Sequence, residues 1–180
     1  MQGKDFPKSM FVFRKYSAIY KDLFVIEKKR IVAKLGRNIL VEHIGSTAID
    51  NLGGKNILDI IMGFKTAKPD NFKSIIEGLG YIFVERSVRS HLRLFFYRYI
   101  VYKGHRIRIH LHATKYGNKY WRERLAFRDY LRRHKDKAIE YAEVKKRAAK
   151  LAKGNKKVYQ REKDLFTNAI TRAAIIESKD

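Results

Sequence analysis

Two short signals in the first third of the chain could carry phosphate or metal chemistry. The first is the pair Gly45-Ser46 after a short apolar run, and the second is Asp59, thirteen residues later in a more apolar run. Glycine lets backbone N–H groups approach a phosphate closely, and a serine hydroxyl adds a further donor. The pair fits a phosphate-binding turn, and it fits equally an ordinary strand-to-helix turn in which Ser46 or Thr47 is the capping residue.

Asp59 is the one charged residue in the run 57–64. Strand geometry puts it on one face with Ile57 and Ile61, and both faces are otherwise apolar, which is typical of a central strand covered on both sides. A buried carboxylate needs a partner or a metal. Asp59 is therefore either a Mg²⁺ ligand for phosphoryl or nucleotidyl transfer, or an aspartate paired with an arginine of the basic segment or with backbone donors.

The third candidate lies in a segment without acidic residues. Residues 86–122 contain no Asp or Glu, but they hold ten Lys or Arg residues and four of the six histidines. One strand candidate in this segment alternates strictly, and its polar face carries Arg106, Arg108, His110 and His112. This row could hold phosphates with a histidine as base or metal ligand, or it could be a solvated sheet face. The two histidines point the same way, but no third ligand stands nearby in the sequence, which disfavours zinc.

The remaining patterns predict the elements that position these side chains. Strands are expected at 39–44, 57–64, 81–85, 92–102 and 106–113, with a hairpin turn at 103–105. Helices are expected at about 19–35, 71–79, 120–133, 137–153 and 156–177, with Asp136 as a cap and Leu165 on the apolar stripe of the last helix. We therefore predict an α+β fold in one domain of residues 1–180: a mixed sheet flanked by helices (about 11–117) and a helical C-terminal part (about 118–178).

The amino-acid composition indicates which kinds of partner and which cellular compartment to expect. The formal net charge of +23 favours acidic partners such as nucleic acid, nucleotides or phosphorylated metabolites, or else reflects a general basic bias. The basic residues at 132–157 are expected to be solvated, and the aromatic residues of the basic segment either stack on bases or belong to the core. The absence of cysteine suits a reducing cytosol, and no membrane span or signal peptide is expected. We therefore expect a cytoplasmic protein.

Three motifs, taken together, resemble the GrpB family. The stretch EHIGSTAIDNLGGKNILDI at 42–60 is similar to that family's segment of the form EHxGSTSVPGLAAKPIIDI. The run RIRIHLHATKYG at 106–117 resembles the family's R-x-HLHV and the loop after it. The run that begins YWRERLAFRDYLRR at residue 120 resembles W-x-x-x-L-x-FRDYLR followed by a YAxLK helix. The resemblance extends from about Tyr16 to Ile176, with the motifs in the same order.

This resemblance implies a nucleotidyltransferase-like fold. In that superfamily a Gly-Ser turn binds nucleotide phosphate, and acidic residues on the following strand hold divalent metal. Carried over by position, Gly45 and Ser46 would bind the phosphates and Asp59 would hold Mg²⁺. The strand that bears His110 and His112 could complete the site.

The sequence departs from the superfamily pattern at two acidic positions. Many nucleotidyltransferases have a second acid two residues after the first, where this chain has Ile61, and no third acid is visible on the later strand. One carboxylate in strongly positive surroundings is a poor two-metal site. Arg128 and Asp129 match the family's FRDYL stretch, either in a role that the sequence does not define or as an ion pair that fixes the helical part to the sheet.

Two functions remain open at this point. In the first, a Mg²⁺-dependent nucleotidyltransferase-like enzyme transfers a nucleotidyl group from a nucleoside triphosphate to an unknown acceptor. Its catalytic residues would be Asp59, His110 and His112, and its phosphate-binding residues would be Gly45, Ser46, Lys55, Arg106 and Arg108. In the second, a catalytically reduced protein binds a nucleotide, or a nucleic acid such as RNA, through the same cleft and basic surface.

Overall fold

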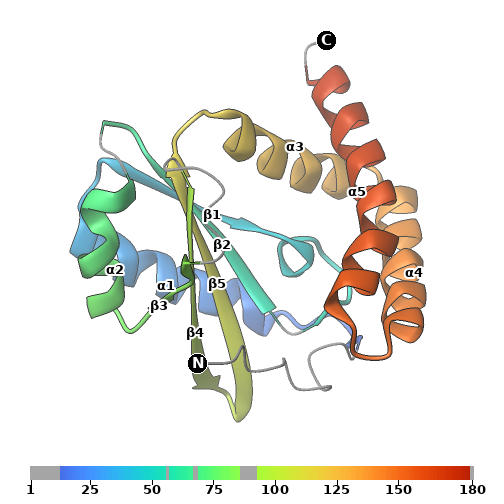
Figure 1. Ribbon diagram of the computed structural model, residues 1–180, viewed down its shortest axis with the longest axis horizontal. Coiled ribbons are helices and arrows are strands. Elements are labelled where there is room, and N and C mark those ends of the chain that lie inside the picture. The colour runs from blue at the N-terminus through green and yellow to red at the C-terminus, as the bar shows by residue number, and fades with distance from the viewer. Residues whose placement is uncertain (1–12, 56, 67–68, 86–92, 179–180) are drawn as a thin grey trace.

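The structure, a computed structural model, describes residues 13–55, 57–66, 69–85 and 93–178 (Figure 1). Its centre is a five-stranded mixed sheet in the order β1-β2-β5-β4-β3. The strands are β1 (Ile39–Ile44), β2 (Ile57–Phe64), β3 (Ile82–Phe83), β4 (Arg93–Tyr102) and β5 (His105–Lys115). β2 pairs with β5 in parallel, and the other three pairs are antiparallel. The predicted α+β fold with a mixed sheet is confirmed, while the predicted beginnings of the sheet core at 11 and of the strand at 92 lie outside the described residues.

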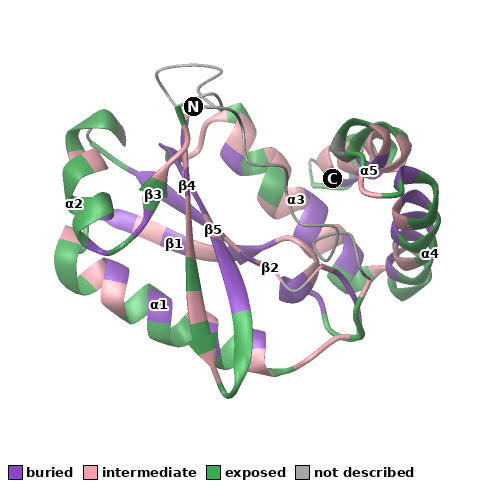
Figure 2. Ribbon diagram, turned by 60° about the horizontal axis from the view of Figure 1, so that its bottom comes forward, coloured by how far each residue is buried: buried purple, intermediate pink, exposed green. Residues whose placement is uncertain are grey.

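One face of the sheet is covered by α1 (Ile19–Leu35) and α2 (Lys73–Gly78), as Figures 1 and 2 show. The buried stripe of α1 has the helical intervals of three and four residues and consists of Tyr20, Leu23, Glu27 and Ile31. The buried carboxylate of Glu27 accepts a hydrogen bond from the Tyr81 hydroxyl at 2.9 Å and is also paired with Arg30. This face therefore holds the main apolar core together with a buried carboxylate that has partners.

β2 is the central strand that the sequence predicts. Its even-numbered side chains join the core beneath α1, and Ile61 on the opposite face packs against Trp121 of α3. A Cβ atom at Gly63 would stand 2.7 Å from the Trp121 ring, so the glycine lets the helix approach the sheet closely. Asp59 shares the face of Ile61 and is therefore turned toward the C-terminal helices.

The hairpin of β4 and β5 forms around a two-residue turn. Lys103 and Gly104 both have positive φ, 48° and 74°, which is the conformation of a tight type I′ hairpin turn. His105, which we expected in the turn, is already the first residue of β5. The alternation predicted for 106–113 is confirmed, because the odd-numbered residues of that run are fully buried in the core beneath α1.

The C-terminal part consists of α3 (Lys119–Arg133), α4 (Lys135–Ala152) and α5 (Lys156–Glu177). In Figure 2, α3 lies against the sheet while α4 and α5 stand beside it. The predicted cap at Asp136 is wrong, because α4 begins earlier, with His134 at its N-cap. The prediction for Leu165 is wrong as well, because its side chain is 80% exposed and α5 is buried through Tyr159, Ile170 and Ala174 instead. No helix in the described part of the chain is long and apolar enough to span a bilayer.

Arg128 joins α3 to the sheet. Its guanidinium donates to the carboxylate of Glu42 at 2.7 Å and to the carbonyl oxygen of His43 at 3.0 Å, both on β1. The neighbouring Asp129 accepts two further hydrogen bonds from the same guanidinium, at 2.8 and 3.0 Å. Of the two roles left open for the Arg128–Asp129 pair, the structure shows the ion pair that fixes the helical part to the sheet.

Candidate functional site

Most of the residues singled out in the sequence line one cleft. These are Gly45, Ser46, Lys55, Asp59, His110 and His112. The cleft has a volume of about 380 Å³ and lies between the β2–β5 region of the sheet and helices α3, α4 and α5. This volume is typical of a small-molecule site. Arg106 and Arg108 belong to the same sheet face but do not line the cleft.

Asp59 faces two imidazoles across the parallel β2–β5 pairing. Its Oδ1 atom lies 3.0 Å from Nδ1 of His110 and 4.0 Å from Nε2 of His112. Burial alone would raise the pKa of Asp59, but hydrogen bonding and charge from the two imidazoles outweigh burial and hold that pKa well below its usual range. The arginine or backbone partner that we considered for Asp59 is therefore replaced by histidines.

The Gly45-Ser46 turn is packed directly against this carboxylate. Gly45 has a φ of 74°, and a Cβ atom there would stand 2.5 Å from an Asp59 carboxylate oxygen. A Cβ atom at Gly54 would in the same way collide with the hydroxyl oxygen of Ser46. Glycine at both positions thus lets the backbone approach the side chains of Asp59 and Ser46 more closely than any other residue type would.

The residues that flank this turn, His43 and Thr47, have a structural role. The Thr47 hydroxyl donates to the carbonyl oxygen of Ile57 at 3.1 Å, and its oxygen lies 3.0 Å from Nε2 of His43. His43 is buried on the α1 side of β1 and stacks on Phe24, with ring centroids 5.0 Å apart. Burial lowers the pKa of His43 to about 4. His43 and Thr47 therefore fix the path of the turn and lie apart from the cleft lining.

The two cleft histidines are held by aromatic side chains. The Phe95 ring lies 5.0 Å from each imidazole, measured between ring centroids. The Tyr120 hydroxyl oxygen lies 2.9 Å from Nδ1 of His112. Burial lowers the pKa of His112, and the nearby Asp59 partly opposes this. The orientations of both rings are thus set by packing and hydrogen bonds that the sequence pattern does not reveal.

Several cationic residues of the cleft come from the helices and were missed. Arg124, Lys145 and Lys163 line it from α3, α4 and α5. We expected the basic residues of 132–157 to be solvated, and for Lys145 this is wrong, because its side chain is only 4% exposed. A signal was present in the sequence: Lys145 is in helical phase with Tyr141 and Ala148, which are both buried.

Lys145 has an unusually low pKa for a lysine. Its Nζ atom donates a hydrogen bond to the carbonyl oxygen of Gly53. Burial lowers the pKa of Lys145 to about 7, with a further contribution from the like charges of Lys163 and Lys55, while Asp59 acts in the opposite direction. An anion in the cleft would stabilise the charged form of this side chain.

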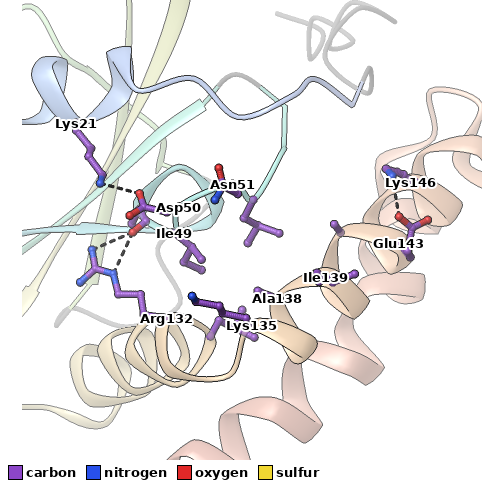
Figure 3. A pocket seen from close by; sticks show the side chains of 14 residues that line it. Lys21, Ile49, Asp50, Asn51, Arg132, Lys135, Ala138, Ile139, Glu143 and Lys146 are labelled. Atoms are coloured by element: carbon purple, nitrogen blue, oxygen red, sulfur yellow. Dashed lines mark hydrogen bonds and ion pairs between the residues drawn. The ribbon is translucent and has the colours of Figure 1, made fainter.

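A second, larger pocket of about 790 Å³ lies between the loop after Gly45-Ser46 and helices α3 and α4 (Figure 3). Most of its charged groups are paired with one another or with the backbone. Asp50 lies here and pairs with Lys21 at 2.7 Å. Arg132 donates two hydrogen bonds to the carbonyl oxygen of Ala48. Both acidic groups that line the larger pocket, Asp50 and Glu143, are thus paired with lysines, and among the described residues of its lining no histidine stands beside a carboxylate as in the first cleft.

Comparison with known proteins finds relatives that match most of the chain. The family model described as GrpB protein matches residues 12–173. The UPF0157 protein YqkA of Bacillus subtilis (strain 168) is 30% identical over 146 residues, which are 80% of this chain and 41% of YqkA, so the chain spans less than half of that relative. The glutamate-rich protein GrpB of Alkalihalophilus pseudofirmus is 28% identical over 158 residues, which are 86% of this chain and 90% of the relative. The crystal structure of the conserved protein GrpB from Enterococcus faecalis matches with a TM-score of 0.80 and 26% identity, over 94% of this chain and 100% of that one.

Proposed function

The chain belongs to the GrpB family, and from that premise we propose that it is a nucleotidyltransferase-like protein that binds a nucleoside triphosphate in the cleft around Asp59 and transfers its nucleotidyl group to an acceptor. One observation carries the proposal: a single carboxylate faces a cleft lined by four Lys or Arg side chains, Lys55, Arg124, Lys145 and Lys163. Such a charge balance favours a polyanion of the size of a triphosphate.

The proposed roles follow from the position of each group. The glycines at 45 and 54 let the backbone pack against the side chains of Asp59 and Ser46, and the Ser46 hydroxyl and the turn's N–H groups would donate to a phosphate in the cleft. The cations from α3, α4 and α5 face this turn across the cleft and would neutralise the phosphate oxygens. The ligand would then touch the sheet and the helices at once, which excludes water from the reacting phosphate.

Mg²⁺, the metal that the resemblance implies, does not fit these side chains as a resident ion. Mg²⁺ prefers six oxygen ligands in octahedral geometry. Asp59 is the one acidic residue in the lining of the cleft, and its immediate neighbours are imidazole nitrogens. Mg²⁺ therefore enters this proposal as the counterion that accompanies a nucleoside triphosphate, held mostly by phosphate oxygens and water.

A lysine substitution in the cleft tests the proposal. Thermal unfolding would be followed with ATP, GTP and inorganic tripolyphosphate, each with and without Mg²⁺. We expect these anions to stabilise the wild type and the Lys163→Ala variant to bind them about tenfold more weakly, because one charge-assisted contact is lost. Lys157→Ala removes the same charge from an exposed site on the same helix and should bind like the wild type. If millimolar tripolyphosphate and nucleotides leave the wild type unchanged, the proposal is wrong.

A specific feature favours RNA binding as a second candidate function. The cleft-side face of the hairpin carries Tyr97 and Tyr99 of β4, with Arg106 and Arg108 of β5 beside them. The Arg108 guanidinium lies 4.4 Å from the Tyr97 ring, and that of Arg106 lies 4.7 Å from the Tyr99 ring. Aromatic rings next to arginines on an accessible sheet face are a known arrangement for single-stranded nucleic acid. Tyr99 is 43% exposed and Arg106 is exposed, whereas Arg108 is only 7% exposed, so Tyr99 and Arg106 form the accessible part of this face.

A further inference from the structure

We infer that Asp59, His110 and His112 form a binding site for one divalent transition-metal ion of the zinc class, with an open coordination position toward the cleft. The inference deepens the proposed function, on which it rests for the location of the ligand cleft, and it replaces Mg²⁺ as the ion held by these side chains. The sequence disfavoured zinc because no third ligand stands near the two histidines. In the fold Asp59 of β2, a strand distant in the sequence, provides that third ligand.

The sheet register brings the three side chains together. In the parallel pairing of β2 and β5, Asp59 stands opposite His110 and Ile61 stands opposite His112. Because side chains two residues apart share a strand face, both imidazoles reach the same carboxylate. One potential ligand atom from each of the three residues lies within 4.8 Å of the others.

The separations suit a small metal ion. Ligands about 2.1 Å from a tetrahedral ion lie about 3.4 Å from one another. The two measured separations from the Asp59 carboxylate, 3.0 Å to His110 and 4.0 Å to His112, lie on either side of that value. Small side-chain rotations would therefore place all three donors around one ion.

The surroundings of His112 also resemble those of a metal ligand, whereas Nε2 of His110 is buried without a hydrogen-bond partner in the described part of the chain. A metal-bound histidine usually engages its second ring nitrogen in a hydrogen bond that fixes the ring. Nδ1 of His112 has this contact with the Tyr120 hydroxyl at 2.9 Å, which turns Nε2 toward Asp59. Phe95 packs against both rings and limits their rotation.

The donor types select the class of metal. Two imidazoles and one carboxylate are a ligand set of zinc, iron and cobalt enzymes, in which a fourth position stays open for water or substrate. Here the open side faces the cleft, where the Ser46 hydroxyl and the cationic side chains lie. Ligation would occupy both imidazoles, so neither could at the same time serve as the base expected from the sequence.

A simpler alternative is a plain ion pair, in which protonated imidazoles neutralise Asp59 and no metal binds. Direct metal titration separates the two. The full-length chain without an affinity tag would be stripped with a chelator and titrated with Co²⁺, whose visible absorption reports tetrahedral nitrogen and oxygen ligation, and then with competing Zn²⁺ or Mg²⁺. We expect one Co²⁺ per chain, displaced by equimolar Zn²⁺ and unaffected by millimolar Mg²⁺.

Matched variants assign the ligands. His112→Asn and Asp59→Asn should weaken Co²⁺ binding by at least about 100-fold, and Tyr120→Phe by about tenfold, because it frees the ring of His112. His134→Asn removes an exposed histidine that pairs with Glu177 and should bind Co²⁺ like the wild type. Circular dichroism and thermal unfolding without metal would show that each variant is folded. If Asp59→Asn does not fold, the His112→Asn result decides.

The outcomes keep this inference separate from the proposed function. Absence of a Co²⁺ spectrum in the wild type, or a spectrum that all variants share, would overturn the metal site. Tripolyphosphate binding in the presence of chelator would still support the anion cleft in that case. Metal binding without any binding of nucleotides or tripolyphosphate would overturn the proposed function and leave the metal site standing.

Discussion

At the scale of single residues, the side chains that define the cleft differ in how visible they are in the sequence. A carboxylate inside an apolar strand and two histidines on an alternating strand stand out against their neighbours, so Asp59, His110 and His112 could be found by pattern. Lys145 could not be distinguished from the other lysines of a basic helix by residue type. Its role depends on burial, which results from the packing of α4 against the loop at Gly53.

Lys145 makes stability depend on pH in a predictable direction. Its pKa is lowered to about 7 in the folded state, against 10.5 for an ordinary lysine, because the amine is buried and faces Lys163 and Lys55, with Asp59 opposing. Between these values the unfolded chain binds a proton that the folded chain does not, so the free energy of unfolding rises with pH. From this group alone we expect a gain of about 2 kcal/mol between pH 7 and pH 9.

Urea unfolding at pH 7, 8 and 9 would measure this gain. In Lys145→Met the pH-dependent gain should disappear relative to the wild type. Lys150→Met removes an exposed lysine from the same helix and should keep the wild-type pH dependence. Equal slopes in wild type and Lys145→Met would show that the buried amine remains protonated throughout.

At the scale of elements, the periodic patterns predicted the sheet and the helices well. β1, β2 and α5 have the bounds that alternation and helical spacing indicate, because each buries a regular face. The errors concern features that periodicity does not determine. Asp136 has the residue type of a cap, but α4 begins next to the end of α3, and Leu165 is apolar but lies beside the buried stripe of α5.

The junction of α3 and β1 gives a prediction at this scale. Arg128 is 8% exposed and connects the two elements through Glu42 and the carbonyl oxygen of His43. Arg128→Met should lower the free energy of unfolding by about 2 kcal/mol, because a buried carbonyl oxygen and a carboxylate lose a charged donor. Arg133 is on the same helix as Arg128, and Arg133→Met breaks only an exposed pair with Glu177 of α5. This variant should therefore change stability little. Denaturant unfolding of both variants checks this, and equal losses would contradict the role of Arg128.

At the scale of the whole molecule, the composition shows the net charge but does not show where the charged side chains lie. The net charge of +23 indicated acidic partners in general. Only the fold shows that four cationic side chains, each from a different segment, line one cleft with a single carboxylate. Long-range packing determines which lysines and arginines come together. The residue pattern singled out Gly45, Ser46 and Asp59 and the family resemblance joined them into one expected site, while the wall opposite them is formed by helices whose position only the fold shows.

The second candidate function predicts a salt-dependent interaction of the whole molecule with single-stranded RNA. If the hairpin face binds the strand, the logarithm of the association constant should fall with the logarithm of the salt concentration, with a slope of about −2 or steeper. This corresponds to about three phosphate contacts, since each contact on a single strand contributes about −0.7. Replacing Tyr97 and Tyr99 by Ala should weaken binding about tenfold and leave the slope unchanged, because stacking releases no counterions. Tyr116→Ala, at an exposed tyrosine just beyond the end of β5 that lies opposite the hairpin turn, serves as the control. A slope near zero in fluorescence anisotropy titrations would exclude this function.

The long separation of the cleft residues along the chain has a consequence for biosynthesis. Asp59 and His110 are 51 positions apart, and Lys163 comes from the last helix. A nascent chain still emerging from the ribosome therefore has no complete site until its final helix has docked. A ligand that contacts both walls of the cleft would stabilise the docked position of α5. In its presence the backbone amides of β2 and α5 should therefore exchange hydrogen with solvent at similar, reduced rates.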